Sequence, residues 1–198
     1  TELPHIWGRP IETIFIGGGT PSVFSAQAID ELLSAIRARV KIQPEAEITL
    51  EANPSTFERE KFHGFKAAGI NRLSIGVQSF NDAHLARIGR IHNAAEAHAA
   101  IQDAVQIFER VNIDLMYALP HQTPAQAQAD AQAAIAHGTS HISAYHLTLE
   151  PNTPFGHTPP QGIPDSETAQ DIEDTVHAAL AAAGYAQYET SAFATASS

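Results

Sequence analysis

The amino-acid sequence predicts an α/β fold built on a parallel sheet. Three observations support this: short apolar runs alternate with helical patterns, glycines and prolines separate them, and polar residues follow several of the apolar runs. This alternation is typical of βαβ units, which build both α/β barrels and doubly wound sheets. The short apolar strands also favour burial on both faces of the sheet.

Periodicity and chain breaks locate the expected elements. We expect strands at residues 14–16, 48–50, 73–77, 111–117, 141–148 and 185–191. We expect helices at residues 26–40, 57–69, 81–89, 93–109, 124–137 and 166–183. Ser25 can cap the first helix, whose apolar residues recur at the spacing of one helical face from Ile29 to Val40. A proline- and glycine-rich loop fills residues 151–164.

Composition excludes several classes of protein. The chain has 198 residues, 43% of them hydrophobic, which suffices for one sizeable domain with a core. No run approaches the roughly 20 apolar residues of a membrane-spanning helix, and no signal peptide is visible, so we expect a cytoplasmic location. With 22 acidic and 11 basic residues, nucleic-acid binding is not expected. With no cysteine, the chain offers no disulfide, thiolate nucleophile or thiolate metal ligand.

A glycine-rich loop connects the first expected strand to the first expected helix. It consists of Gly17, Gly18, Gly19, Thr20 and Pro21. Glycines lack a β-carbon, so a ligand can approach their backbone N–H and C=O groups closely. A plain tight turn is the alternative, but it does not require three consecutive glycines with their entropic cost. The pattern matches neither the dinucleotide-binding nor the P-loop motif, and it indicates a site for a charged, nucleotide-like cofactor.

Other polar residues stand where expected strands end, which is where parallel α/β folds bind ligands. Glu51 can accept hydrogen bonds from ribose hydroxyls or a ligand amine, or it can serve the next helix as a cap. Gln78 can contact a ligand or brace its loop. Asp114 lies within an apolar run and needs a partner, either a ligand or the other half of a buried structural pair. Arg90 stands apart from the strand ends, in the segment GRIH at 89–92, and can bind a carboxylate through two hydrogen bonds or lie at the surface.

Four sequence motifs occur in the order found in a known family. They are FIGGGTPS at 15–22, LEANP at 50–54, RLSIGVQSF at 72–80 and IDLMYALP at 113–120. Together they resemble the radical S-adenosylmethionine proteins related to oxygen-independent coproporphyrinogen III oxidase. The ANP and QSF triplets, with LTLEPNT at 147–153, are more similar to the HemW-type haem chaperone branch than to the decarboxylating oxidase. The resemblance covers about residues 10–193.

The resemblance implies a fold and a binding site. The fold would be an incomplete parallel (β/α)6 barrel that lacks its first strand and binds S-adenosylmethionine at the strand ends. The cofactor-binding residues that it implies are Gly18, Gly19, Thr20, Glu51, Gln78, Arg90 and Asp114. The first four of these would contact the methionine side of one S-adenosylmethionine molecule. The last three match positions at which oxidase-type members contact a second molecule.

The sequence departs from the family pattern in two respects. The CxxxCxxC motif that holds a [4Fe–4S] cluster is absent, and so are the haem segment and C-terminal domain expected downstream. We interpret residues 1–198 as one partial core domain truncated at both ends, with a genuine cluster-free relative as the alternative. Ala118 replaces a glycine that many relatives carry, a change that should be tolerated unless the φ angle there is positive.

The resemblance leaves three hypotheses about function. In the first, the full-length parent binds haem and delivers it to an acceptor protein. In the second, it is an oxidase that decarboxylates coproporphyrinogen III through a 5′-deoxyadenosyl radical. In the third, which we favour for the 198 residues alone, the chain is a cofactor-binding fragment with no activity of its own.

Overall fold

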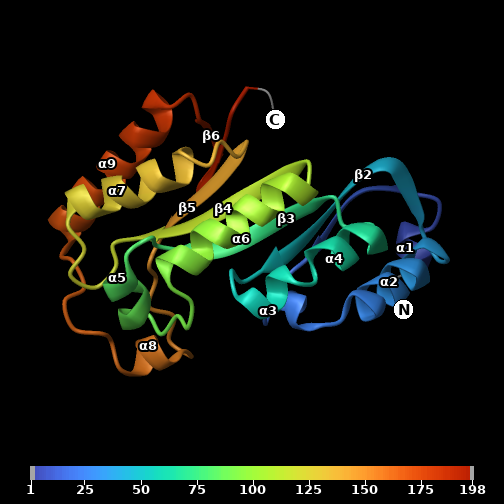
Figure 1. Ribbon diagram of the computed structural model, residues 1–198, viewed down its shortest axis with the longest axis horizontal. Coiled ribbons are helices and arrows are strands. Elements are labelled where there is room, and N and C mark those ends of the chain that lie inside the picture. The colour runs from blue at the N-terminus through green and yellow to red at the C-terminus, as the bar shows by residue number, and fades with distance from the viewer. Residues whose placement is uncertain (1–2, 197–198) are drawn as a thin grey trace.

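Seven strands form one sheet in the computed structural model, which describes residues 3–196 (Figure 1). Their order across the sheet is β1-β2-β3-β4-β5-β7-β6. The strands are β1 (Pro10–Ile16), β2 (Lys41–Ala52), β3 (Arg72–Gln78), β4 (Arg110–Tyr117), β5 (His141–His146), β6 (Ala186–Glu189) and β7 (Ala192–Ala194). The first five run parallel in chain order, which confirms the predicted parallel sheet.

The last strand was predicted incorrectly. Residues 185–191 were expected to form one strand, but the chain turns at Thr190 and Ser191 and forms the hairpin of β6 and β7. Strand β7 then pairs antiparallel with β5. Two residues can connect antiparallel neighbours but cannot make the crossover that parallel strands require. The five parallel strands therefore end in a short antiparallel border.

Helices follow most strands, as expected, although their bounds differ. They are α1 (Leu3–Ile6), α2 (Ala26–Arg37), α3 (Thr56–Arg59), α4 (Phe62–Ala68), α5 (Asp82–Arg87), α6 (Ala94–Ile107), α7 (Pro124–Ile135), α8 (Pro154–His157) and α9 (Ser166–Ala182). Ser25 caps α2 as predicted, its Oγ accepting the Ala28 N–H at 3.1 Å. The single helix expected at 57–69 is instead two helices, and the short α1 and α8 were not foreseen.

The two faces of the sheet differ in chemistry. Alternate strand residues such as Leu50, Ile75 and Ile113 are fully buried beneath the helices, where they form the core. Figure 1 shows α4 and α6 lying across this covered face. The intervening residues, such as Ser74 and Asn112, line the concave face of the curled sheet. Residues on both faces are buried as expected, since Thr49, Ser74 and Asn112 are at most 4% exposed, but those of the concave face are polar.

The borders of the sheet are strands β1 and β6. Phe15 in β1 has 59% of its surface exposed. A barrel that lacks a preceding strand leaves such a border strand without a neighbour on one side. Within residues 3–196, no helix combines the length and apolar character that crossing a bilayer requires.

Candidate functional site

A pocket opens at the carboxyl ends of the parallel strands. It gathers six of the seven residues that the sequence singled out: Gly18, Thr20, Glu51, Gln78, Arg90 and Asp114. These residues come from the loops after β1 and α5 and from strands β2, β3 and β4. The seventh, Gly19, belongs to the same glycine loop but does not line the pocket. The tertiary structure thus brings together residues that are up to 96 positions apart in sequence, Gly18 and Asp114.

The glycine loop lies against Glu51. The Gly18 N–H donates to Glu51 Oε2 at 3.1 Å, and Gly18 has a φ of 116°, which a side chain would strain. A β-carbon on Gly17 would lie 2.9 Å from Phe15 Cε1 and 3.0 Å from the Glu51 carboxyl carbon. Gly17 therefore permits the close approach of loop and carboxylate. Glu51 does not cap the following helix; Ser55 does, through a hydrogen bond from the Glu58 N–H.

A buried glutamate holds the far side of the loop. Glu58 accepts hydrogen bonds from the Asn53 N–H at 2.7 Å and from the Ser22 hydroxyl. The Asn53 side chain in turn donates to Thr20 Oγ1 at 3.0 Å. Thr20 itself has a φ of 60°, an uncommon value for a residue with a β-carbon. This chain of contacts fixes the direction in which the glycine loop presents its backbone groups to the pocket.

Asp114 lies on the floor of the pocket among neutral partners. Its carboxylate accepts hydrogen bonds from Ser74 Oγ at 2.9 Å and from Asn112 Nδ2 at 2.7 Å. No arginine, lysine or histidine within residues 3–196 forms an ion pair with it. Burial raises the pKa of Asp114 to about 6; these hydrogen bonds and one from Ser143 oppose the rise, and Glu51 adds to it. Of the two alternatives for Asp114, the structural pairing is present, since Ser74 and Asn112 both donate to its carboxylate; the contact with a ligand stays a prediction.

Gln78 ends β3 with a strained backbone. Its φ is 70°, its side chain is buried, and its Oε1 accepts the Tyr145 hydroxyl at 2.7 Å. Burial, together with Asp114, raises the pKa of Tyr145 to about 12, so Tyr145 stays a hydrogen-bond donor at neutral pH. A β-carbon at Gly76 would lie 3.1 Å from Gln78 Nε2. Positive φ at a residue other than glycine is a form of strain that concentrates at functional sites.

Arg90 forms one wall of the pocket with most of its donors unused. Within residues 3–196, Arg90 donates from Nη1 to Asn53 Oδ1, and at 3.4 Å this hydrogen bond is long. Gly89, with a φ of 73°, turns the chain from α5 so that the arginine is directed toward the pocket. No carboxylate of the described residues forms an ion pair with Arg90. The guanidinium is therefore available to an anionic group of a ligand.

Sequence reasoning did not select five of the residues that line the pocket: Ala52, Asn53, Ser74, Gly76 and Tyr145. All but Tyr145 stood inside quoted motifs, so a signal was present. Ser74 and Gly76 precede Gln78 by four and two residues, and the period of a strand puts all three on one face. Tyr145 had no comparable signal, because it contacts Gln78 across 67 positions of sequence.

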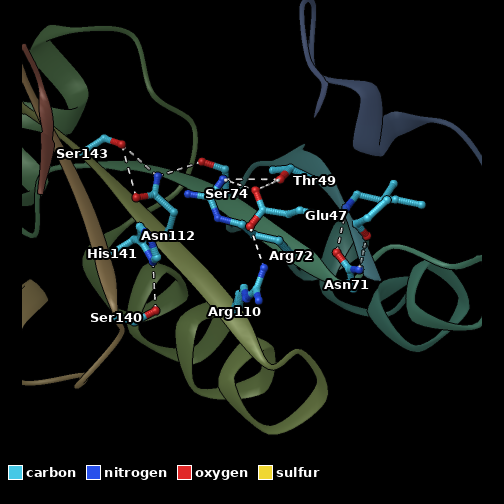
Figure 2. A network of polar contacts seen from close by, with 12 residues as sticks. Glu47, Thr49, Asn71, Arg72, Ser74, Arg110, Asn112, Ser140, His141 and Ser143 are labelled. Carbon is cyan, nitrogen blue, oxygen red and sulfur yellow. Dashed lines mark hydrogen bonds and ion pairs between the residues drawn. The ribbon is translucent and has the colours of Figure 1, made fainter. Parts of the chain in front are cut away.

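A second polar network lies at the opposite end of the same concave face (Figure 2). Glu47 accepts the Arg110 guanidinium at 3.0 Å and lies 3.7 Å from Arg72. Figure 2 also shows a separate group centred on Asn112, which donates to Ser74 Oγ at 2.9 Å and to Ser143 Oγ at 3.0 Å. This second group reaches Asp114, to which Asn112 also donates.

The fold and the pocket define a class of protein: a curled parallel α/β sheet with a glycine loop and carboxylates at its strand ends. Residues 2–134, more than half of the chain, match the Radical SAM superfamily. The chain therefore belongs to the radical S-adenosylmethionine superfamily. This assignment agrees with the family resemblance carried by the four motifs.

Relatives in the same superfamily cover the chain almost completely. Heme chaperone HemW of Haemophilus influenzae is 51% identical over 187 residues, which are 94% of this chain and 49% of that protein. Heme chaperone HemW of Escherichia coli is 48% identical over 194 residues, 98% of this chain and 51% of that protein. The chain therefore spans about half the length of the curated relatives that it matches.

Solved structures support the fold. Coproporphyrinogen III oxidase (HemN) of Escherichia coli, a radical SAM enzyme, has a TM-score of 0.87 and 28% identity, covering 98% of this chain and 45% of that one. Elp3 of Methanocaldococcus infernus has a TM-score of 0.65 at 17% identity, which shows the fold alone. The predicted fold class, an incomplete radical-SAM-type barrel, is confirmed.

The superfamily implies S-adenosylmethionine and a [4Fe–4S] cluster, and the chain suits only the first. Within residues 3–196, the hydrogen bond from Gly18 leaves Glu51 Oε1 able to accept from an amino group, and a β-carbon on Gly18 or Gly19 would meet no atom within 4 Å, so the loop backbone borders open space. The sequence contains no cysteine, and residues 3–196 contain no group of three His, Cys, Asp or Glu side chains arranged to hold a metal. These 198 residues therefore do not provide the thiolate ligands of the cluster.

Proposed function

We propose that this chain is the S-adenosylmethionine-binding half-barrel of a longer protein that binds haem and delivers it to an acceptor protein. The observation that carries the proposal is the pocket in which Gly18, Glu51 and Asp114 meet. The relatives named heme chaperones, at up to 51% identity, support the haem part of the proposal. We place the ligands of the [4Fe–4S] cluster on residues outside this chain.

Each side of the pocket has a separate role in holding the cofactor. The free oxygen of Glu51 accepts a hydrogen bond from the amino group of the methionine moiety, and the backbone at Gly18 and Gly19 lies beside it. Gln78, Arg90 and Asp114 contact the far side of the ligand or a second molecule. When bound near a reduced cluster, S-adenosylmethionine would be the precursor of the 5′-deoxyadenosyl radical. The chain's own contribution is to bind and orient the cofactor.

Haem transfer by the full-length protein tests the proposal. Loaded with haem and mixed with an apoprotein acceptor, the protein should pass its haem on, as measured by the absorbance of the acceptor after separation. Release of carbon dioxide from coproporphyrinogen III under anaerobic, reducing conditions should be absent. Failure to bind or transfer haem would sink the proposal.

Oxidative decarboxylation is the second candidate function. The TM-score of 0.87 with coproporphyrinogen III oxidase favours it, since the two half-barrels share nearly the whole backbone. The 28% identity to that enzyme, against 51% to a heme chaperone, weighs toward haem delivery. Formation of protoporphyrinogen IX with release of carbon dioxide would establish the oxidase. The 198 residues alone should bind S-adenosylmethionine without turning it over.

A further inference from the structure

A second pocket adjoins the first, and Arg90 lines both. Its volume is about 440 Å³, within the range of about 300–1,000 Å³ usual for small-molecule sites. The residues that form its apolar walls are Ile88, Met116, Leu147, Pro154 and Phe155. None of these residues was selected as a site residue from the sequence. The first pocket, in contrast, is lined mainly by polar groups.

Two strands place the apolar pocket directly beside the polar one. Met116 stands two positions after Asp114 in β4, so both side chains are on the same face of the strand. Leu147 follows the last residue of β5, and its N–H donates to the Tyr117 carbonyl at 3.0 Å, which extends the pairing of β4 and β5. A ligand that lies along β4 would therefore pass from polar to apolar surroundings.

The outer wall of the apolar pocket is a fixed turn around helix α8. Thr153 Oγ1 donates to the Glu150 carbonyl at 2.7 Å and accepts the Gly156 N–H at 3.1 Å. A β-carbon on Gly156 would lie 2.0 Å from the Glu150 carbonyl oxygen, so this turn requires glycine. These contacts hold Pro154 and Phe155 over the pocket. The wall is thus built by specific hydrogen bonds and close packing.

The only charge at this pocket among its described lining residues is the guanidinium of Arg90. Arg90 spends one donor on the long 3.4 Å hydrogen bond to Asn53, which leaves a pair of donors for a carboxylate. An apolar cavity with a single cation at its mouth suits a flat apolar ligand that carries carboxylate groups. It does not suit a second S-adenosylmethionine, whose sulfonium charge would lie against apolar walls and near a cation.

We propose that this apolar pocket receives one edge of a tetrapyrrole, with a propionate carboxylate bound by Arg90 and the ring edge packed against Met116 and Leu147. The inference rests on the proposed function, which makes haem or a porphyrin the cargo. It adds the place of binding: beside the S-adenosylmethionine pocket, with Arg90 between the two ligands. Tetrapyrrole and S-adenosylmethionine should therefore affect each other's binding.

Iron-free protoporphyrin IX is the probe, because its fluorescence reports binding without any contribution from iron ligation. The chain should bind it, and Leu147→Trp, which fills the pocket, should weaken binding at least tenfold. Leu32→Trp is the matched control, since Leu32 is 44% exposed on α2 and does not line the pocket. It should change porphyrin affinity less than twofold. Phe155→Ser, which removes an apolar wall without adding bulk, should also weaken binding if Leu147→Trp fails to fold.

The carboxylate contact has its own test. Protoporphyrin IX should bind about tenfold more tightly than its dimethyl ester, and Arg90→Leu should abolish that preference. Equal affinity for the two ligands in the unsubstituted chain, or unchanged porphyrin binding by both Leu147→Trp and Phe155→Ser, would overturn the inference.

Failure of the pocket assignment is distinguishable from failure of the proposed function. If the full-length protein transfers haem while these variants of the chain bind porphyrin normally, only the location is wrong. If the full-length protein neither binds nor transfers haem, the proposed function fails whatever the porphyrin titration of the chain gives.

Discussion

The two ends of the concave face are built from the same strands, yet they satisfy their charges differently. At the amino ends, Glu47 meets Arg72 and Arg110, and Thr49 Oγ1 lies 3.3 Å from its carboxylate. At the carboxyl ends, Glu51 accepts one backbone N–H and has no cationic partner among the described residues. Both glutamates lie on β2, four residues apart and on the same face.

The contrast separates a structural network from a binding site. A partly buried carboxylate with two guanidinium partners needs nothing further, and losing it leaves cations without a partner. A carboxylate with a single neutral donor, near an arginine with unused donors, keeps bonding capacity for a ligand. The same reasoning applies to Asp114, whose pKa is raised to about 6 by burial among neutral partners. Substitutions at the two ends should therefore produce different kinds of effect.

The largest expected effect is on cofactor affinity. Glu51→Gln should weaken S-adenosylmethionine binding by the chain about 10- to 100-fold, because a hydrogen bond to a charged group contributes about 1.5–3 kcal/mol. Isothermal titration calorimetry measures this affinity directly. Glu47→Gln on the same strand is the control and should leave the affinity within about twofold. Equal losses from both substitutions would remove the distinction between the two ends.

The next effect is a pH dependence of stability from Asp114. Its pKa in the folded protein, about 6, exceeds the ordinary 3.8, so the folded state holds the proton more tightly than the unfolded state does. Stability from this group is fully present below about pH 4 and is lost as pH rises to about 6. Asp114→Asn should remove this loss, on the order of 2 kcal/mol. Urea unfolding from pH 4 to pH 7 measures the free energy of unfolding of both proteins. A difference between them that stays constant over this range would show that Asp114 does not titrate there.

A smaller effect on stability is expected at the amino end. Glu47→Gln should lower the free energy of unfolding by about 1 kcal/mol, since the pair with Arg110 is partly exposed and that with Arg72 is long. Urea denaturation measures this change. Glu45→Gln, an exposed position on the same strand, is the matched control and should shift stability by less than about 0.5 kcal/mol. No difference between the two variants would mean that the ion-pair network does not stabilise the fold.

The smallest expected effect concerns Ala118, just beyond the end of β4. Its φ is 56° and it is almost fully buried. Because a β-carbon is strained at positive φ, alanine costs stability here relative to the glycine that many relatives carry. Ala118→Gly should relieve about 1 kcal/mol of strain and lose about 0.8 kcal/mol of methyl burial, a net change within about 0.5 kcal/mol. Ala144→Gly, at a buried position inside β5, should instead cost about 1–2 kcal/mol. Thermal or urea unfolding of both variants compares them, and a loss as large at Ala118 as at Ala144 would argue against strain.

Much of the site was readable from the sequence because its signals are local. The glycine loop, Glu51 and Gln78 each directly follow an apolar run, and the carboxyl ends of parallel strands meet at one edge. The positions at which strands end thus predict which side chains gather. Arg90 follows no apolar run and was singled out only for its ability to bind a carboxylate, yet it is among the six of seven residues that line one pocket.

The sequence by itself determined the order of strands and helices, the parallel sheet and the set of polar residues at its edge. These depend on periodicity and on breaks in the chain, which are properties of neighbouring residues. The tertiary structure alone decided the polar concave face, the antiparallel pairing of β7 with β5, the contact of Tyr145 with Gln78 and the apolar pocket beside Arg90. Each of these depends on contacts between residues that are distant in sequence, and such contacts leave no local sequence pattern from which to predict them.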